Sequence, residues 1–392
     1  MKKVCVLLNG PICNDSRVIK EIRTMSTVAE VDLFYLEGTD EDKLLFNNRV
    51  RLFPIKRSFN FRTKLIQNTF FYREFLFYVD EVLKQEVKYD YIWANDFPDL
   101  MPAVRIKEKI GAKLIYDSHE IFIETLNQCF PSKAVFYKRI LYKMCLFIMK
   151  KAGRRAEKRM LIKVDRFVTT CESYKSFFAS TYKINDIRIV MNCPHYAQVI
   201  VPHNLRKEFD IPQNSFIVVF QGKLIPARAL HEIIDSMNYV SKDIYMILIG
   251  DGMLETKLKK QVRDCNLSGR VFFTGRVPSS EMVNYAAGAD SGINLQPNVN
   301  LSKYFGSTNK FFEYMHAGLP MIVSHTPENK YIMTRYNMGI FVNDCYNSKE
   351  IADAISKMAN MDLSDYKENC RKAAKEYNWE NQEKIILDLV SY

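Results

Sequence analysis

Short apolar runs alternate with helical patterns twice along this chain, and this alternation limits the folds open to it. Runs of about five apolar residues suit buried strands. Strands that alternate with helices favour a parallel sheet with helices on both faces. We therefore predict an α/β protein of two doubly wound, Rossmann-like domains. The predicted strands are 4–8, 31–36, 89–94, 112–116, 166–170 and 186–191, then 216–220, 245–249, 271–273, 291–294, 321–323 and 339–342.

The length agrees with two domains, because 392 residues exceed one core of average size. The alternation lapses around residues 195–214, so we place an N-terminal domain at 1–200 and a C-terminal domain at 201–378. The last helix, 379–392, follows a polar segment and is expected to pack back on the first domain. Ligands of such sheets bind outside the carboxyl ends of the strands, which predicts a cleft between the two domains.

Several function classes lack their sequence signatures. The nine cysteines are scattered without a Cys-x-x-Cys pair, which indicates reduced thiols in a cytoplasmic protein and no zinc site. There is no Gly-x-Ser-x-Gly, His-Glu-x-x-His or P-loop, and no Gly-x-Gly-x-x-Gly follows the first strand. The apolar start resembles a signal peptide, but Asn9 ends the run too early. No charge-free run approaches the roughly 18 residues that span a bilayer.

Most of the net charge of +11 lies in one segment, residues 130–163. Its eleven basic residues face a single acid, Glu157, and apolar residues interleave at helical spacing. A basic amphipathic helix suits an anionic membrane surface, at about 1 kcal/mol per nearby basic residue. The alternative is a helix whose apolar face packs into the core of the protein. Nucleic acid, as a partner of this basic segment, ranks below both the membrane and the core interpretations. The predicted membrane contacts are Lys138, Arg139, Lys143, Lys150, Lys151, Arg154 and Arg155.

A short helix beginning near residue 309 carries polar groups on its first turns. Asn309, Lys310 and Glu313 precede a Gly-Leu-Pro stop and another strand. A helix N-terminus suits a phosphate, and a Glu there can accept hydrogen bonds from ribose hydroxyls. An ordinary helix with a surface Glu is the alternative. On the loop after 271–273, the backbone at Arg276 and Val277 is placed to contact a base.

Glycines and bases follow two strands of the second domain. After 216–220, Gly222 allows a tight turn, and Lys223 and Arg228 can meet a diphosphate. Fixed cations stabilise the charge that grows on a leaving phosphate oxygen. After 245–249, Gly250 and Gly252 permit close backbone approach. Each loop also fits a plain turn between a strand and a helix.

In the first domain, polar residues follow three predicted strands. His119 follows 112–116, where it can bond a substrate hydroxyl or a developing oxyanion and titrates near neutrality. A lone His is more often structural, but acids flank this one. A helix is expected over 100–110, after the loop that contains Asp96. Candidate acceptor-side residues are Gly10, Asn14, Asp96 and Glu120.

With these residues in place, the chain resembles a glycosyltransferase of family 4, from a bacterial branch that assembles polysaccharides and other glycans, with the two-domain GT-B fold. The resemblance rests on several motifs in order: residues 14–18, 116–120, 192–194, 222–228, 250–252, 273–275 and 309–314. It implies that Lys223 and Arg228 hold the donor diphosphate and Glu313 the ribose. It places His119 beside the transferred sugar, and implies retention of anomeric configuration without a metal or other cofactor.

Two positions depart from the family pattern. Phe305 stands where the family often has a first Glu, eight residues before Glu313. Ala229 replaces a common Gly after the cationic residue. The first departure leaves the identity of the sugar open, and to a lesser degree the activity.

The resulting hypothesis is a glycosyltransferase that uses a nucleotide-sugar donor and a lipid-linked or growing glycan acceptor. It would work at the cytoplasmic face of the membrane as a peripheral protein, with no nucleic-acid partner. One alternative is a nucleotide-sugar epimerase or phosphorylase of the same fold. Another is a catalytically silent, membrane-associated homologue in a glycan-assembly complex.

Overall fold

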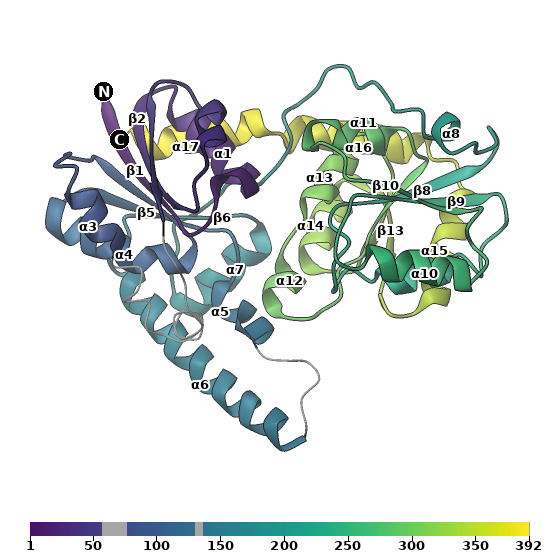
Figure 1. The fold of residues 1–392 in the computed structure, drawn as a ribbon, viewed down its shortest axis with the longest axis horizontal. Coiled ribbons are helices and arrows are strands. Elements are labelled where there is room, and N and C mark those ends of the chain that lie inside the picture. The colour runs from purple at the N-terminus through teal and green to yellow at the C-terminus, as the bar shows by residue number, and fades with distance from the viewer. Residues whose placement is uncertain (57–76, 130–135, 392) are drawn as a thin grey trace. The chain divides into compact units, whose positions relative to one another are not determined.

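The computed structural model describes residues 1–56, 77–129 and 136–391, which form two α/β units (Figure 1). Unit 1 comprises Met1–Met191, Asn300–Ser302 and Gln382–Tyr392, and unit 2 comprises Asn192–Val299 and Lys303–Asn381. Each unit contains one sheet with only parallel pairs among its described strands. The predicted fold class of two Rossmann-like domains is confirmed.

The sheet of unit 1 has the strand order β3-β2-β1-β4-β5-β6-β7. The order reverses between β1 and β4, and ligands of doubly wound sheets bind at such a switch point. The central strands are apolar and buried on both faces, as parallel sheets require. The strands are β1 (Lys2–Leu8), β2 (Ala29–Leu36), β3 (Val50–Ile55), β4 (Tyr91–Asn95), β5 (Lys113–Ser118), β6 (Arg166–Thr169) and β7 (Ile187–Ile189).

The main helices of unit 1 begin and end at recognisable signals. Asp15 caps α1 by accepting from the backbone N–H groups of Arg17 and Val18 at 3.2 and 3.0 Å. Gly111, at φ +74°, ends α4. The helices are α1 (Ser16–Met25), α3 (Phe77–Leu83), α4 (Asp96–Ile110), α5 (Phe122–Thr125), α6 (Phe136–Leu161) and α7 (Glu172–Tyr182).

The sheet of unit 2 has the order β10-β9-β8-β11-β12-β13, over a core of Val, Ile, Leu and Met side chains. Its strands are β8 (Phe216–Gln221), β9 (Ile244–Ile249), β10 (Val271–Gly275), β11 (Ser291–Asn294), β12 (Met321–Ser324) and β13 (Gly339–Val342). The helices are α8 (Leu205–Glu208), α9 (Leu230–Ser236), α10 (Glu255–Asp264), α11 (Met282–Ala287), α12 (Leu301–Phe305), α13 (Asn309–His316), α14 (Pro327–Tyr336), α15 (Ser348–Ala359) and α16 (Ser364–Glu376).

The final helix, α17 (Trp379–Ser391), begins in unit 2 and ends in unit 1. Within unit 1, the hydroxyl of Thr24 on α1 donates to Glu383 at 3.1 Å. The backbone N–H of Met191 donates to Gln382 at 2.9 Å. The C-terminal part of α17 is therefore hydrogen-bonded to α1 and to Met191, which follows β7.

Two details of unit 1 differ from the sequence-based expectation. The edge strand β3 was not predicted, because Pro54 interrupts its apolar run. Proline lacks an N–H and is tolerated at a sheet edge, where β3 lies. The predicted start of α4 at residue 100 is wrong, since the helix begins at Asp96. Pro98 lies in the first turn of α4. The N–H groups of a first turn have no partner within the helix, so a proline there removes no hydrogen bond.

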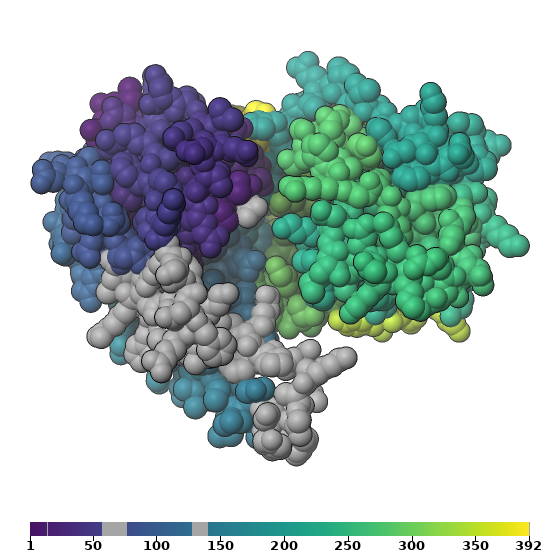
Figure 2. Space-filling view, viewed as in Figure 1, coloured from purple at the N-terminus to yellow at the C-terminus, as the bar shows by residue number. Residues whose placement is uncertain are grey.

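The helix α6 is a single element of 26 residues that projects beyond the sheet of unit 1 (Figure 1). Atoms of α6 lie at the surface at that end of the unit in the space-filling view (Figure 2). Among the helices in the described ranges, none combines the length and the hydropathy that a bilayer crossing needs.

Candidate functional site

In unit 2, two cationic side chains meet at the turn that follows β8. A Cβ atom added to Gly222 would lie 3.1 Å from Nη1 of Arg228 and 4.0 Å from Cε of Lys310. Gly222 itself has φ +115°, a conformation that favours glycine. The side chains of an Arg and a Lys from two different elements therefore lie against the backbone of Gly222.

Both cations are partly or wholly removed from water. Lys310 is 5% exposed, and its Nζ lies 4.3 Å from the ring centroid of Phe220. Burial and the neighbouring Arg228 lower the pKa of Lys310 well below its usual range. Burial also lowers the pKa of Arg228. A bound anion favours the charged forms of both side chains, so this turn suits a phosphate or diphosphate.

The first turns of α13 are fixed to β8 by hydrogen bonds. The side-chain amide of Gln221 donates to the carboxylate of Glu313. The backbone N–H of Gln221 donates to the hydroxyl of Tyr314 at 3.1 Å, and that hydroxyl lies 3.1 Å from the carbonyl oxygen of Val219. Glu313 is thus held on the helix face nearest to Gly222, with Lys310 one turn earlier.

The loops at the carboxyl ends of β8 and β9 pack with no room for side chains at Gly250 and Gly252. A Cβ on Gly250 would lie 2.3 Å from the carbonyl oxygen of Gly222, and one on Gly252 would lie 2.4 Å from that of Leu224. The N–H of Gly250 donates to the oxygen of Gly275 at 2.9 Å. These glycines keep the turn around Gly222 in place.

Arg228 lies between two strained residues. Ala227 and Ala229 have φ values of +63° and +51°. The left-handed conformation costs a non-glycine residue about 1–2 kcal/mol. Ala229 is the position where the family resemblance expects glycine, so the strain is specific to this chain's sequence. Strain of this kind gathers at functional sites, where the surrounding structure fixes one conformation.

The other predicted donor residues differ in their exposure and contacts. The side chains of Lys223 and Arg276 are exposed and have no hydrogen bond or ion pair with any described residue. Val277 is buried. Asn309 is exposed and accepts a hydrogen bond from Asn192 at 3.0 Å. The structure therefore adds Lys310 to Arg228 at this turn, and the role of Lys223, which follows Gly222 in sequence, stays a prediction.

Unit 1 contains a buried network of charges at the carboxyl end of β5. Arg17 donates from Nη2 to both carboxylate oxygens of Asp117 at 2.8 and 2.9 Å, and its Nε lies 2.8 Å from Glu21. On the same carboxylate, Asp117 Oδ2 lies 3.3 Å from Nε2 of His119. The other ring nitrogen of His119 lies 3.8 Å from Asp96.

This network sets the protonation of His119. Burial opposes the charged imidazolium, but Asp117 and Asp96 outweigh it and raise the pKa of His119 to about 10. Burial likewise raises the pKa of Asp96 to about 6. Against its own burial, Asp117 is held below its usual pKa range by Arg17 and His119. At neutral pH, His119 is therefore a cation that donates hydrogen bonds, and it does not serve as a base.

A hollow of about 240 Å³ lies beside this network in unit 1. Asp96 lines it, and Oδ1 of Asp96 accepts from the backbone N–H groups of His119 at 2.8 Å and of Glu120 at 3.3 Å. The backbone of Asn14 lies in the short 3₁₀ helix η1 (Ile12–Asn14), and its side chain lies outside the described residues. The other lining residues are Leu8, Asn9, Gly10, Pro11, Asp15, Asn95, Pro98 and Phe122.

Sequence reasoning missed three residues of this region. Arg17 and Glu21 are buried charges on the face of α1 that also carries Val18 and Ile22. Two charges spaced i,i+4 on an apolar helix face are a signal that could have found them. Asp99 is also fully buried and accepts from the backbone N–H of Asn9 at 2.9 Å.

One cluster in the described part of the chain has the spacing of metal ligands. Ligand atoms of Glu21, Asp117 and His119 all lie within 4.8 Å of one another. Arg17 already supplies the positive charge between the two carboxylates, and His119 is itself cationic. A metal ion would have to displace a buried guanidinium, so the donor set does not favour one.

The basic residues of α6 divide into two groups. Lys150 and Arg154 form ion pairs with Glu124, the former at 2.7 Å. The side chains of Lys143, Lys151 and Arg155 have no ion pair with any described residue. The side chains of Lys138 and Arg139 lie outside the described residues.

The apolar residues of α6 that the structure describes are exposed, so the alternative in which they form core is wrong for them. Phe147 is 68% exposed and Ile148 63%. The others are Ile140, Leu141 and Met144. By contrast, Glu157 is buried and accepts from the hydroxyl of Tyr116 at 3.0 Å and from that of Tyr182. The C-terminal half of α6 is anchored in unit 1, while its N-terminal half presents apolar side chains to solvent.

Comparison with known proteins links unit 2 to a family. Residues 203–377 match the family model described as "Glycosyl transferases group 1". The matched region contains Gly222, Arg228, Lys310 and Glu313. No curated protein matches this sequence at a significant level.

Solved structures resemble the whole chain. HepE of Anabaena in complex with UDP and glucose has a TM-score of 0.72 and 15% identity, with 100% of both chains covered. Sucrose-phosphate synthase from Thermosynechococcus elongatus has a TM-score of 0.72 and 15% identity, with 99% of this chain and 98% of that chain covered. The lipopolysaccharide outer core galactosyltransferase WaaB has a TM-score of 0.67 and 12% identity, with 99% of each chain covered. HepE has also been solved with UDP-glucose. At these identities the likeness establishes the GT-B fold.

Proposed function

We propose that this protein is a glycosyltransferase that moves a sugar from a nucleotide-sugar donor to a lipid-linked or growing glycan. One observation carries the proposal. Arg228 and Lys310 are two desolvated basic side chains that meet at Gly222. They lie in the region that matches group 1 glycosyl transferases.

The donor would bind through its diphosphate at this turn. Arg228 and Lys310 would each contact phosphate oxygens, and Lys223 would reach the diphosphate from the exposed side of the same loop. Glu313, held by Gln221, would accept hydrogen bonds from the ribose hydroxyls. The UDP and UDP-glucose bound by HepE support a donor of this class.

The chemistry is the exchange of one C–O bond for another. The bond between the anomeric carbon and the phosphate oxygen breaks, its electron pair goes to the phosphate, and an acceptor hydroxyl forms the new bond. The hydroxyl proton passes to the leaving phosphate. Arg228 and Lys310 would stabilise the charge on that phosphate, which is the task a metal ion performs elsewhere. We propose a metal-independent reaction that retains the anomeric configuration.

The groups of unit 1 would act on the sugars. Cationic His119 can donate a hydrogen bond to a hydroxyl of the transferred sugar, and Asp117 orients its ring. The hollow beside Gly10 and Asp96 would take part of the acceptor. The raised pKa of Asp96 lets this carboxyl accept a proton near pH 6.

A membrane-bound acceptor is supported by α6. Its exposed apolar side chains lie on the same helix as Lys143, Lys151 and Arg155. Exposed apolar residues with basic neighbours suit an anionic lipid surface. We propose that α6 docks on the inner face of the cell membrane as a peripheral contact. WaaB, by its name, acts on lipopolysaccharide, a lipid-linked glycan.

A panel of nucleotide sugars tests the donor half of the proposal. A ligand that binds only the folded state raises the melting temperature, and the same donors are then assayed for hydrolysis and for transfer to lipid extracts. Arg228→Gln should weaken donor binding at least tenfold. Arg263→Gln, an exposed charge on α10, should leave it unchanged. If no nucleotide sugar stabilises the protein, or if Arg228→Gln binds as wild type does, the proposal is wrong.

Phe305 favours a second candidate, a catalytically silent homologue. It lies on α12 with its ring 5.4 Å from that of Tyr304, and it offers no carboxylate to a sugar. Tight donor binding without turnover on any acceptor would select this candidate. Interconversion of the free donor without an acceptor would instead identify an epimerase.

A further inference from the structure

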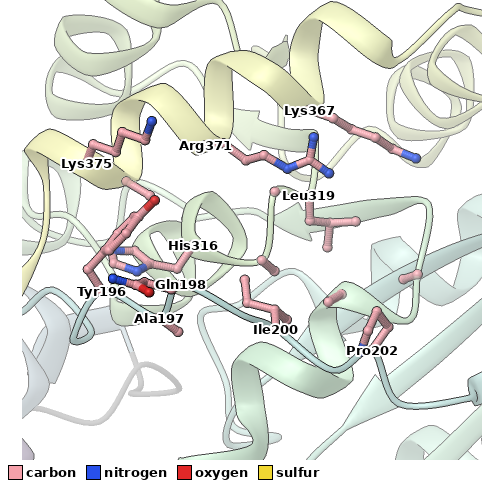
Figure 3. A pocket seen from close by; sticks show the side chains of 15 residues that line it. Tyr196, Ala197, Gln198, Ile200, Pro202, His316, Leu319, Lys367, Arg371 and Lys375 are labelled. Carbon is pink, nitrogen blue, oxygen red and sulfur yellow. The ribbon is translucent and has the colours of Figure 1, made fainter.

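Unit 2 has a second hollow, of about 430 Å³, between α16 and the segment that follows unit 1 (Figure 3). Its volume lies in the range of small-molecule sites. Tyr196, Gln198 and Ile200 come from the segment, and His316 and Leu319 come from the end of α13 and the turn after it. The proposed function uses none of these residues.

One wall of the hollow is a row of cations. Lys367, Arg371 and Lys375 are spaced i, i+4 and i+8 on α16, so their side chains share one helix face, as Figure 3 shows. None of the three side chains forms a hydrogen bond or ion pair with a described residue. Like charges at this spacing repel one another. The row has no ion-paired counter-ion in the described chain, although the charge of Arg371 also acts on Glu368, whose pKa is lowered first by Lys372.

Glu368, Glu376 and Glu380 are bonded to other partners, whereas the side chain of Asp365 on α16 forms no hydrogen bond or ion pair with a described residue. Glu368 pairs with Lys372 at 2.7 Å on another face of the same helix. Glu376 pairs with Arg335 at 3.1 Å, and Glu380 lies 2.9 Å from His195. The residues that line the hollow include no Asp or Glu.

The opposite wall is formed by small residues and rings. A Cβ on Gly318 would lie 3.3 Å from Nε of Arg371, so the guanidinium lies against bare backbone. The rings of Tyr196 and His316 meet edge to face at 6.4 Å. Nε2 of His316 lies 2.8 Å from the carbonyl oxygen of Tyr377, which fixes the ring. This wall combines rings and aliphatic side chains with the amide of Gln198, and Arg371 lies against it.

We propose that this hollow is a second binding site, separate from the turn at Gly222, for a small molecule with a diphosphate or two phosphate groups. Side chains at i and i+4 are about 5–6 Å apart at their Cβ atoms. A single phosphate can therefore contact two of the three cations, whereas a diphosphate can reach all three. The wall of rings, aliphatic side chains and Gln198 would contact the rest of the ligand.

The occupant would contact three parts of the chain at once. The segment from Tyr196 to Pro202 follows the point where the chain leaves unit 1, after Met191. The helix α16 precedes the point where it returns, after Asn381. His316 ends α13, whose first turns carry Lys310 and Glu313. A ligand here is therefore placed to influence the donor turn through α13, as a regulator.

Calorimetric titration with inorganic pyrophosphate tests this site. Because pyrophosphate can also bind at Gly222, the titration is done with the Arg228→Gln variant as background. Adding Arg371→Gln should weaken binding at least tenfold. Adding Lys372→Gln removes the same charge from the neighbouring residue, which faces Glu368, and should change binding less than twofold.

Two results would overturn the proposal. One is no measurable pyrophosphate binding by the Arg228→Gln protein, and the other is equal weakening by the two added substitutions. Both positions are exposed, and melting temperatures within a few degrees of wild type confirm that the variants fold. The test needs no nucleotide sugar, so its outcome is independent of the proposed transfer reaction.

Discussion

Arg17 and Asp117 form a two-point hydrogen-bonded ion pair, with Nη2 of Arg17 lying 2.8 and 2.9 Å from the two carboxylate oxygens. The residues are separated by 100 positions in sequence, and both are buried. The pair fastens α1 to the carboxyl end of β5. It also orients the carboxylate that holds His119.

Removal of Arg17 should destabilise the protein strongly. Arg17→Met leaves Asp117 and Glu21 buried without their cation, and breaking a buried pair costs about 3–5 kcal/mol. Urea unfolding measures the loss. Arg105→Met, which breaks an exposed pair with Glu108, is the control and should cost under about 1 kcal/mol. Equal losses in the two variants would contradict the structural role of Arg17.

His119 should make stability depend on pH in the alkaline range. Its pKa in the folded protein is about 10, above the value of about 6.5 in an unfolded chain. The contribution of His119 to the free energy of unfolding is therefore complete below pH 6.5, and it is lost as the pH rises from 6.5 to 10. Urea unfolding at pH 6.5, 8 and 9.5 should show a smaller decline for His119→Gln than for wild type. Parallel declines would show that His119 is neutral in the folded state.

Binding of a diphosphate should be accompanied by proton uptake at Lys310. In the free protein the pKa of Lys310 is lowered by burial and by Arg228. A bound diphosphate restores the charged form, so affinity should fall as the pH rises. Titration calorimetry in Tris and in HEPES should give different heats for wild type and for the exposed control Lys259→Met. The difference between the heats in the two buffers should vanish in Lys310→Met. Identical heats in Tris and in HEPES for wild type would contradict the prediction.

Gly250 should tolerate no side chain. Gly250→Ala places a Cβ 2.3 Å from the carbonyl oxygen of Gly222, at φ +126°. Strain and overlap together should cost about 2–4 kcal/mol. Gly269 has open space around its Cβ position, so Gly269→Ala should change stability by less than about 0.5 kcal/mol. Thermal unfolding compares the two, and similar melting temperatures would argue against the tight loop crossing.

Loss of Phe147 should weaken membrane binding. Burying a Phe side chain in lipid is worth about 1.5–3 kcal/mol, so Phe147→Gln should lower vesicle partitioning roughly tenfold or more. Flotation with phosphatidylglycerol vesicles measures it. Met253→Gln removes an equally exposed apolar side chain from unit 2 and should have no effect. Absence of wild-type flotation would remove the membrane proposal.

The sequence predicted the order of strands and helices well, because parallel strands are buried on both faces and appear as continuous apolar runs. Such a run is a local feature of the sequence, so a single segment such as 216–220 was enough to predict a strand. The strand β3 escaped because Pro54 is tolerated only at an edge, and edge position is a property of the whole sheet.

The candidate sites were predicted less completely. Gly222, Arg228 and Glu313 follow strands or begin helices, which are local signals. The burial of Lys310 was not predicted, since lysines are rarely buried and its environment comes from Phe220 and Arg228, far away in sequence. Likewise, the role of Arg17 depends on Asp117, and neither residue alone indicates it.

The two left-handed alanines beside Arg228 define a position where heat resistance and turnover oppose each other. Ala229→Gly would relieve about 1 kcal/mol of backbone strain. It would also let the guanidinium sample orientations that the alanines now exclude. Under the proposed function, a hardier protein obtained in this way would hold its donor more loosely.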